Sequence, residues 1–203
     1  MFRKVITALD LKGQLELKKP SVPFPPYASW TDEDRQDTTD LYETFNVLDG
    51  YGLAAPQIGI RKRAIVVNLE KLGVDSPVAK VVMINPVMET WGPMQKSEEA
   101  CFSVPHVSAR VNRPVNCKVT YQDLEGNEKV IQVSDYASAC LQHEIDHLDG
   151  TLYIDRLPRV SASMLLKKAR KVEKKKTEAR TAARIAFEKE HSQIMGDSTV
   201  TKR

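Results

Sequence analysis

Residues 139–150 have the sequence ACLQHEIDHLDG. His143 and His147 are four residues apart, so on a helix both imidazoles lie on one face and can reach the same metal ion. Glu144 projects to the side of this face, near enough to exchange a proton with a water molecule on the metal, whose pKa falls toward ~7. The stretch therefore predicts a helix with a hydrolytic metal centre, and the alternative is a pair of hydrogen-bonded histidines on a partly buried face.

A catalytic metal site normally has three protein ligands, so a third must come from elsewhere. Cys101, in the segment EEACFSVP at residues 98–105, is the best candidate. Glu173 follows the histidines, as the third ligand does in zinc peptidases, but it lies in a highly charged segment. Cys140 shares the helix face, yet its spacing from His143 makes coordination of the same ion awkward, and we expect it in the wall of a pocket.

Residues 50–59, GYGLAAPQIG, form a third notable segment. Its small residues allow another backbone, such as that of a peptide, to come close, and Gln57 offers an amide donor. A glycine-rich turn before a strand at Ala64 is the structural alternative. The segment is not a phosphate-binding loop, because the Gly-Lys-Ser/Thr ending is missing.

The remaining pattern predicts an α+β fold, with antiparallel β-sheets around the buried metal-binding helix and a long C-terminal helix. Short β-branched or alternating runs predict strands, with Asn85-Pro86 and Trp91–Pro93 as breaks and a hairpin turn at 123–127. These strands are expected at 64–69, 81–84, 115–121 and 128–133. Helices are expected from a cap at Thr31 to about Asp49, from a cap at Ser134 or Asp135 to about Gly150, and from Ser161 to Ile194 or Met195.

Length and composition fit one globular domain. The chain has 203 residues, of which 41% are hydrophobic. It contains no apolar run of the ~20 residues needed to cross a bilayer, and its first residues lack the features of a signal peptide. Three cysteines are too few for a disulfide framework and favour a reducing compartment. Of these, Cys117 is expected to pack in the core.

Charge divides the chain unevenly. Residues 161–190 carry a net charge of +6, whereas the rest carries −3. We therefore expect a catalytic domain at 1–160, followed by a basic helix and a short flexible end at 161–203. This segment has three interpretations: a solvated helix, a helix packed on the body through residues 164–166, or a contact with nucleic-acid phosphates.

The three segments, in this order, resemble the motifs of the peptide deformylase family. The first motif is similar to residues 50–59, the second to 99–103, and the third to 143–147 continued by 148–150. The resemblance extends from about Leu41 to about Arg156, and includes Arg113-Pro114 and Gln142. It implies a hydrolase of protein biosynthesis that removes the formyl group from the N-terminal methionine of new polypeptides and releases formate.

The resemblance also implies roles for individual residues. Cys101, His143 and His147 would hold one divalent metal ion, which would be Fe2+ in the cell, with Zn2+, Ni2+ or Co2+ as substitutes. Glu144 would act as general base and then as acid. Gln57 and the backbone N–H of Phe102 would donate to the oxyanion.

Substrate contacts are implied in the same way. The backbone at Gly52 would pair with the substrate main chain. The methionine pocket would be lined or flanked by Tyr51, Glu99, Ala139 and Cys140.

Three residues depart from the family pattern. Ala100 stands where glycine is usual, Phe102 where leucine is usual, and Tyr51 where a small aliphatic residue is usual. A methyl group at position 100 would restrict the backbone if this position required a positive φ. The departures concern substrate preference more than reaction type.

The expected partners are nascent N-formyl-methionyl peptides and, through basic residues 167–184, the ribosome, with no membrane and no specific DNA. The expected location is the cytoplasm of a bacterial or phage-infected cell, and an organelle is the alternative.

Two rival functions remain. A zinc endopeptidase would not need Cys101 and would need a downstream ligand such as Glu173. A deformylase-like binding protein with an inactive catalytic site would bind metal but would not turn over formyl peptides.

Overall fold

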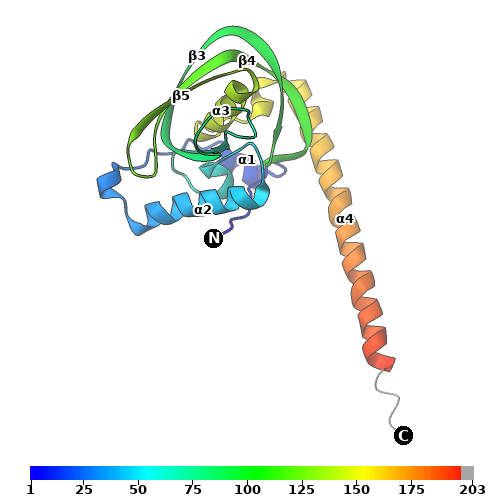
Figure 1. The fold of residues 1–203 in the computed structure, drawn as a ribbon. Helices are drawn as coiled ribbons and strands as arrows, with labels where there is room; N and C mark the ends of the chain where they lie inside the picture. Colours follow the sequence, from blue (N-terminus) through cyan, green and yellow to red (C-terminus); the bar gives the residue numbers. More distant parts are fainter. Residues whose placement is uncertain (198–203) are drawn as a thin grey trace.

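The computed structural model describes residues 1–197. This part of the chain forms four α-helices and five strands, with three short 3-10 helices in the connections (Figure 1). In chain order they are α1 (Leu11–Leu17), α2 (Asp32–Leu48), β1 (Gly52–Ala54), β2 (Ala64–Asn68), β3 (Lys80–Cys101), β4 (Val104–Gln122), β5 (Glu128–Ser134), α3 (Asp135–Leu148) and α4 (Arg159–Asp197).

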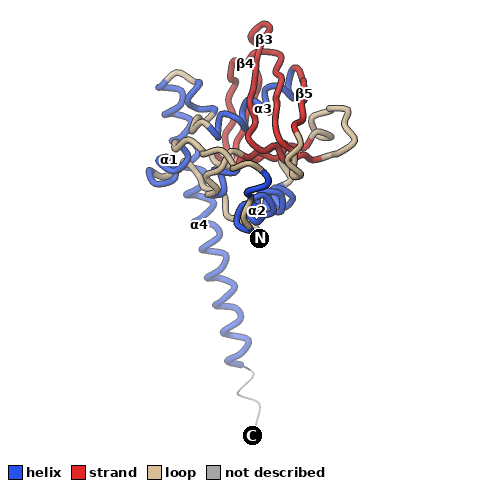
Figure 2. The backbone as a smooth tube through the Cα atoms, turned by 90° about the vertical axis from the view of Figure 1, so that its left-hand side faces the viewer, coloured by secondary structure: helices blue, strands red, loops and turns tan. Residues whose placement is uncertain are grey.

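The strands of residues 1–197 form one five-stranded sheet in the order β1-β2-β3-β4-β5, and every neighbouring pair is antiparallel. The sheet curves over α3 (Figure 2). This confirms the predicted α+β class and the predicted turn at 123–127, which joins β4 to β5.

Strand β3 is much longer than predicted. The expected breaks at Asn85-Pro86 and Trp91–Pro93 are wrong, because β3 continues through both of them. Its register with β4 shifts between Ile84 and Val87 and again between Trp91 and Met94. Bulges tolerate proline and bend a strand, so these two irregularities help the hairpin of β3 and β4 to wrap around the helix.

Helix α3 lies at the centre of the fold. It contacts each of the five described strands. Its apolar residues Leu141, Ile145 and Leu148 are buried against sheet residues such as Ile65 and Met83. Because the helix is covered on nearly all sides, its polar residues are also buried, which is expected only where they bind one another or a ligand.

Helix α2 begins as predicted. Thr31 and Asp34 form a reciprocal capping box, and Leu41 and Phe45 pack into the core. The helix ends at Leu48, with Asp49 in the left-handed conformation, close to the predicted end at about Asp49.

Helix α4 begins at Arg159, slightly before the predicted start, and projects away from the body (Figure 1). Its first turns belong to the body, because Ala169 is fully buried and Leu165 and Leu166 pack on the same cluster. The flexible end predicted for the last residues falls partly on 198–203, which lie outside the described residues. In residues 1–197, no helix is long and apolar enough to cross a membrane.

Candidate metal centre and active site

Two elements bring the three predicted ligands together. Cys101 ends β3, and His143 and His147 lie one turn apart on α3. One potential ligand atom from each lies within 4.8 Å of the others, and Sγ of Cys101 is 3.2 Å from Nε2 of His147. A thiolate and two imidazoles converging in this way can hold one divalent ion.

The His143 ring is held from two sides. Its Nδ1 lies 2.7 Å from Oε2 of Glu99, and the ring stacks on Tyr153 with centroids 5.8 Å apart. A carboxylate at one ring nitrogen fixes the tautomer that leaves the other nitrogen for a metal. Glu99, predicted as a substrate contact, therefore acts on His143 as well as lining the pocket.

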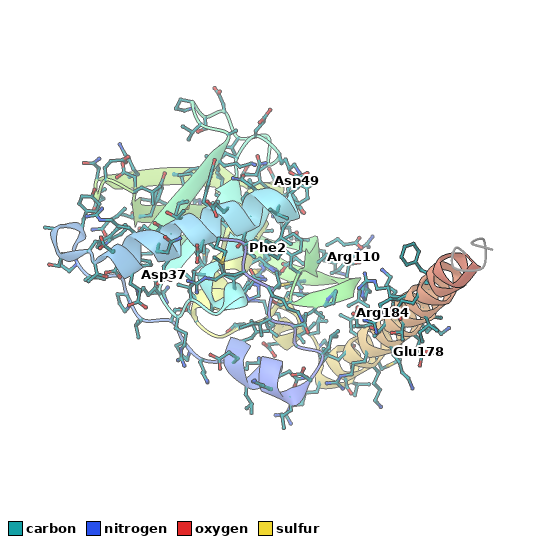
Figure 3. All side chains as sticks on the ribbon, turned by 90° about the horizontal axis from the view of Figure 1, so that it is seen from below. Phe2, Asp37, Asp49, Arg110, Glu178 and Arg184 are labelled. Carbon is teal, nitrogen blue, oxygen red and sulfur yellow. The ribbon has the colours of Figure 1, made fainter. Side chains whose placement is uncertain are left out.

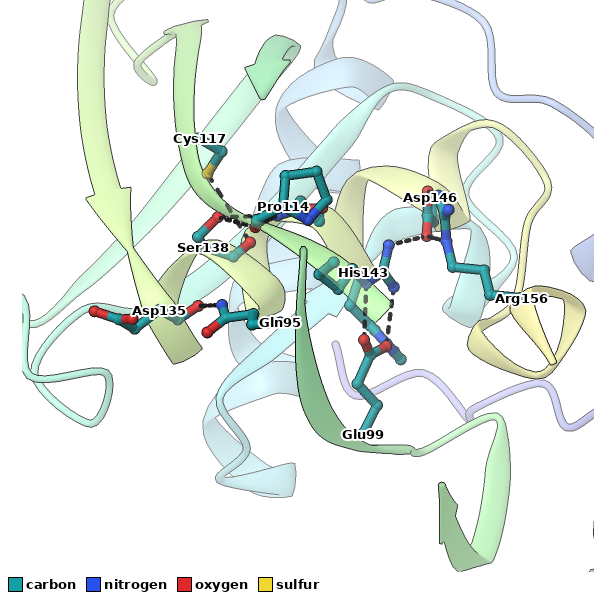
Figure 4. Close-up of polar contacts among 11 residues, drawn as sticks. Gln95, Glu99, Pro114, Cys117, Asp135, Ser138, His143, Asp146 and Arg156 are labelled. Carbon is teal, nitrogen blue, oxygen red and sulfur yellow. Dashed lines mark hydrogen bonds and ion pairs between the residues drawn. The ribbon is translucent and has the colours of Figure 1, made fainter. Parts of the chain in front are cut away.

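A buried ion network supports Glu99 (Figure 4). Arg113 donates to both carboxylate oxygens of Glu99 at 2.7 and 2.9 Å, and to Asp146 at 2.6 Å. Arg156 donates to the same Asp146 at 2.7 and 2.5 Å. Burial raises the pKa of Glu99, but the hydrogen bonds from Arg113 and His143 outweigh burial and lower this pKa to about 2. Glu99 is therefore an anion beside His143 at any working pH.

Gln57 points its amide at the centre. Its Nε2 donates to Sγ of Cys101 at 3.3 Å and to Oγ of Ser103 at 3.1 Å, while its Oε1 accepts from the N–H of Ala54 at 2.8 Å. The backbone bond fixes which end of the amide faces the centre. Gln57 thus presents a fixed donor next to Sγ of Cys101.

Glu144 is buried beside the two histidines. Among the described residues its Oε2 has no hydrogen-bond partner. Burial raises the pKa of this carboxyl from its ordinary value of 4.5 to about 7. A Cβ atom on Gly52 would lie 2.6 Å from Cγ and from Oε1 of Glu144, so only glycine at position 52 leaves room for the carboxylate.

One cavity of about 600 Å³ collects the predicted site residues. It is lined by Tyr51, Gly52, Gln57, Glu99, Cys101, Phe102, Ala139, Cys140, His143 and Glu144. His147 is 1% exposed and reaches the centre through Nε2. Their predicted chemical roles stay predictions.

Neither rival ligand belongs to the group formed by Cys101, His143 and His147 among the described residues. Cys140 lines the cavity wall, as expected, and Cys117 is buried in the core against α3. Glu173 lies on α4, where its Oε2 is 2.6 Å from Nε2 of His106.

The fold accommodates the two residues next to Cys101 that depart from the family pattern. Ala100 pairs with Ser108 in the sheet and has no positive φ, whereas the Phe102 ring packs so closely over Gly50 that a Cβ atom there would lie 2.7 Å away.

Sequence reasoning missed three contributors. Arg113 was noted only as part of the family resemblance, and Asp146 was not singled out. Tyr136 also lines the cavity. Helical spacing could have found it, since Tyr136, Cys140 and His143 recur on one face of α3.

Comparison with known proteins agrees with this geometry. Residues 11–163 match the model of the polypeptide deformylase family. A peptide deformylase from Bartonella tribocorum is 40% identical over 139 residues, covering 68% of this chain and 78% of that protein. One from Pelagibacter ubique is 36% identical over 148 residues, covering 72% of this chain and 85% of that protein.

Solved structures show the same likeness. A peptide deformylase from Ehrlichia chaffeensis in complex with actinonin superposes with a TM-score of 0.72 at 31% identity, covering 85% of this chain and 98% of that one. A peptide deformylase from Legionella pneumophila has a TM-score of 0.75 at 28% identity, covering 87% and 98%.

Proposed function

The chain belongs to the peptide deformylase family, and from this premise we propose that it removes the N-formyl group from the initiator methionine of newly made polypeptides, releasing formate. The observation that carries the proposal is the convergence of Cys101, His143 and His147, together with the buried carboxyl of Glu144 in the lining of the same cavity as Cys101 and His143. This arrangement suits hydrolysis of an amide whose acyl part is small.

The donor set fits one divalent metal ion held by Cys101, His143 and His147, and we propose Fe2+ in the cell, with Zn2+, Ni2+ or Co2+ able to substitute. Three protein ligands leave a coordination position open for chemistry. When bound, such an ion supplies Lewis acidity, which polarises a carbonyl and lowers the pKa of water.

Glu144 is proposed to move the protons of the reaction. Its carboxylate takes a proton from the attacking water and returns it to the amine that leaves as the new N-terminus. A pKa of about 7 suits both tasks, because the carboxyl can gain and lose a proton near neutral pH. Since Oε2 has no hydrogen-bond partner among residues 1–197, this oxygen is available for the exchange.

Two donors are proposed to stabilise the charge that develops on the formyl oxygen. One is Nε2 of Gln57, which already points at the centre. The other is the backbone N–H of Phe102, in the turn between β3 and β4. Loss of one such donor typically lowers the rate by ~10²–10³-fold.

The peptide is proposed to bind alongside β1. This strand is the last in the order of the described sheet, so the backbone at Gly52 has an outer edge to which an extended chain can add. The first side chain would then enter the cavity between Tyr51 on one side and Ala139 and Cys140 on the other.

The test is formate release from formyl-Met-Ala-Ser by protein prepared anaerobically with Fe2+. We expect the parent to release formate, and Glu144→Ala and Cys101→Ala to lose this activity. Glu144→Ala should keep its metal, whereas Cys101→Ala should lose it. No formate from a metal-loaded parent would refute the proposal, and activity without Cys101 would refute the ligand set.

We further propose that α4 contacts the ribosome in the cytoplasm of a bacterial or phage-infected cell. The basic side chains between residues 167 and 184 are exposed, and α4 extends beyond the body, as Glu178 and Arg184 illustrate in Figure 3. Such a helix can neutralise phosphates of ribosomal RNA in a salt-dependent way.

Charge reversal tests this contact. Reversing Lys171, Lys175 and Arg180 to glutamate should abolish pelleting with ribosomes at low salt without lowering formate release. The matched control reverses three exposed lysines on the body, Lys4, Lys12 and Lys96. Equal pelleting of parent and α4 variant would exclude the contact.

A further inference from the structure

Two tyrosines meet at the cavity. Their rings are in edge-to-face contact, with the centroids of Tyr51 and Tyr136 5.4 Å apart and an interplanar angle of 82°. Both residues line the cavity and are about half exposed, at 47% and 46%. The pair therefore has one side against protein and one side open to whatever enters.

The two rings come from separate and well-anchored elements. Tyr51 directly precedes β1, and its carbonyl oxygen accepts a hydrogen bond from the N–H of Asn68 in β2 at 2.8 Å. Tyr136 lies in the first turn of α3. Edge-to-face pairs of this geometry are mutually attractive, so the rings hold each other in place across the gap between strand and helix.

The cavity wall along α3 runs from the metal ligands to this pair. Tyr136 precedes His143 by seven residues, which is about 10 Å along a helix. The residues between them on the same face, Ala139 and Cys140, are small, and leave room for a side chain beside the helix.

This part of the wall offers little to a charged or strongly polar group. Both oxygens of Glu99 are bound by Arg113, and one of them also by His143. Burial raises the pKa of the Cys140 thiol well above its usual value, so the thiol stays neutral. The space thus suits an unbranched apolar side chain whose far end meets aromatic rings.

We propose that Tyr51 and Tyr136 together determine specificity for the first side chain, selecting a thioether over a hydrocarbon chain of the same length. The inference rests on the proposed function and deepens it. The polarizable sulfur of a thioether makes favourable contacts with aromatic rings, often at the ring edge about 5 Å away, and a methylene group lacks this polarizability. Both rings line the cavity, so a thioether that enters it can contact aromatic carbon.

The test compares formyl-Met-Ala-Ser with formyl-norleucyl-Ala-Ser, because norleucine replaces the sulfur by methylene with little change in length. For the parent we expect kcat/KM to favour methionine about two- to tenfold. The double variant Tyr51→Leu with Tyr136→Leu should turn over both peptides with a ratio near one. Tyr136→Phe keeps the ring and should keep the preference.

Tyr42→Leu is the matched control, since Tyr42 is an exposed tyrosine on α2 away from the cavity lining. It should leave the ratio unchanged. A parent ratio of one, or a double variant that keeps the parent ratio, would overturn the inference while leaving deformylation intact.

A second measurement separates the inference from the proposed function. Calorimetric titration with the product peptides Met-Ala-Ser and norleucyl-Ala-Ser gives the same selectivity from affinity alone. Tighter binding of the methionine peptide by the parent, lost in the double variant, supports the inference even if turnover is absent. Equal affinities for the two peptides in the parent overturn it, and absence of formate from either formyl peptide refutes the function instead.

Discussion

Oε2 of Glu99 lies 2.7 Å from Nδ1 of His143, and the same carboxylate is held by the buried guanidinium of Arg113. The orientation of one metal ligand therefore depends on an ion network outside the metal centre. This network links β3, where Glu99 lies, to β4, which carries Arg113, and to α3 through Asp146.

Replacing Glu99 by glutamine should weaken metal binding. The amide keeps the size of the carboxylate but removes the negative charge that favours the Nδ1–H tautomer, and loss of such outer contacts typically costs ~10–100-fold in metal affinity. Competition for Zn2+ against a chromophoric chelator measures the change. Glu98→Gln is the control, because Glu98 is exposed and its carboxylate accepts from Ser108. Equal affinity for Glu99→Gln and parent would contradict the positioning role.

Replacing Arg113 by methionine should strongly destabilise the fold. Arg113 is 1% exposed and joins two buried carboxylates, which would then face each other without a cation between them. Removing one partner of a buried ion pair typically costs ~3–5 kcal/mol. Urea unfolding of the metal-free protein measures the loss, and Arg110→Met, an exposed position on the same strand, should unfold close to the parent. A loss below about 1 kcal/mol would mean that the network is not needed for stability.

The metal-binding helix could be predicted because its signal is local. The spacing of His143 and His147 and the apolar residues between and after them need no knowledge of the rest of the chain. Cys101 was the best of several candidates for the third ligand, and the resemblance to a family then implied it, since nothing in residues 98–105 alone shows which groups they approach.

The ion network could not be predicted because it joins residues that are far apart in the sequence. Glu99 and Arg113 meet because β3 and β4 pair, and their register depends on bulges that add residues to one strand. A single shift in register would move Arg113 to the other face of the sheet.

Helix α1 was also missed. It is short and contains Gly13, and it depends on the cap bond from the N–H of Gly13 to Asp10.

The acid stability of the protein should depend on Asp34. Hydrogen bonds from Lys62 and from the hydroxyl and N–H of Thr31 lower the pKa of Asp34 from its ordinary value of 3.8 to about 2. Since the folded pKa is lowered, this carboxylate stabilises the fold above about pH 4, and the contribution is lost as the pH falls from about 4 to 2. The free energy of unfolding, measured by urea at several pH values, should therefore fall less steeply in this window for Asp34→Asn than for the parent.

Lys62→Met provides the second arm of this measurement. It removes the largest cause of the shift, so its unfolding free energy should also fall less steeply between pH 4 and 2. Parallel curves for the parent and both variants would show that the pair does not contribute to acid stability.

Helix α4 should divide into a part that stabilises the body and a part that does not. Contacts with the body are found between Ala162 and Lys176. They include the buried Ala169, a hydrogen bond of 2.7 Å from Nε of Arg170 to the carbonyl of Leu9, and the Glu173–His106 pair. Truncation after Arg159 would expose this apolar cluster and should cost about 2 kcal/mol or more of unfolding free energy.

Truncation after Glu178 should instead leave thermal stability and formate release at parental levels, because the anchoring contacts remain. It removes Arg180 and Arg184, and should therefore weaken pelleting with ribosomes and reduce its salt dependence. The two truncations together separate anchoring from docking, since a contact with the ribosome that depended only on the fold of the body would survive the shorter deletion. A large loss of stability on truncation after Glu178 would show that the outer part of α4 also holds the body together.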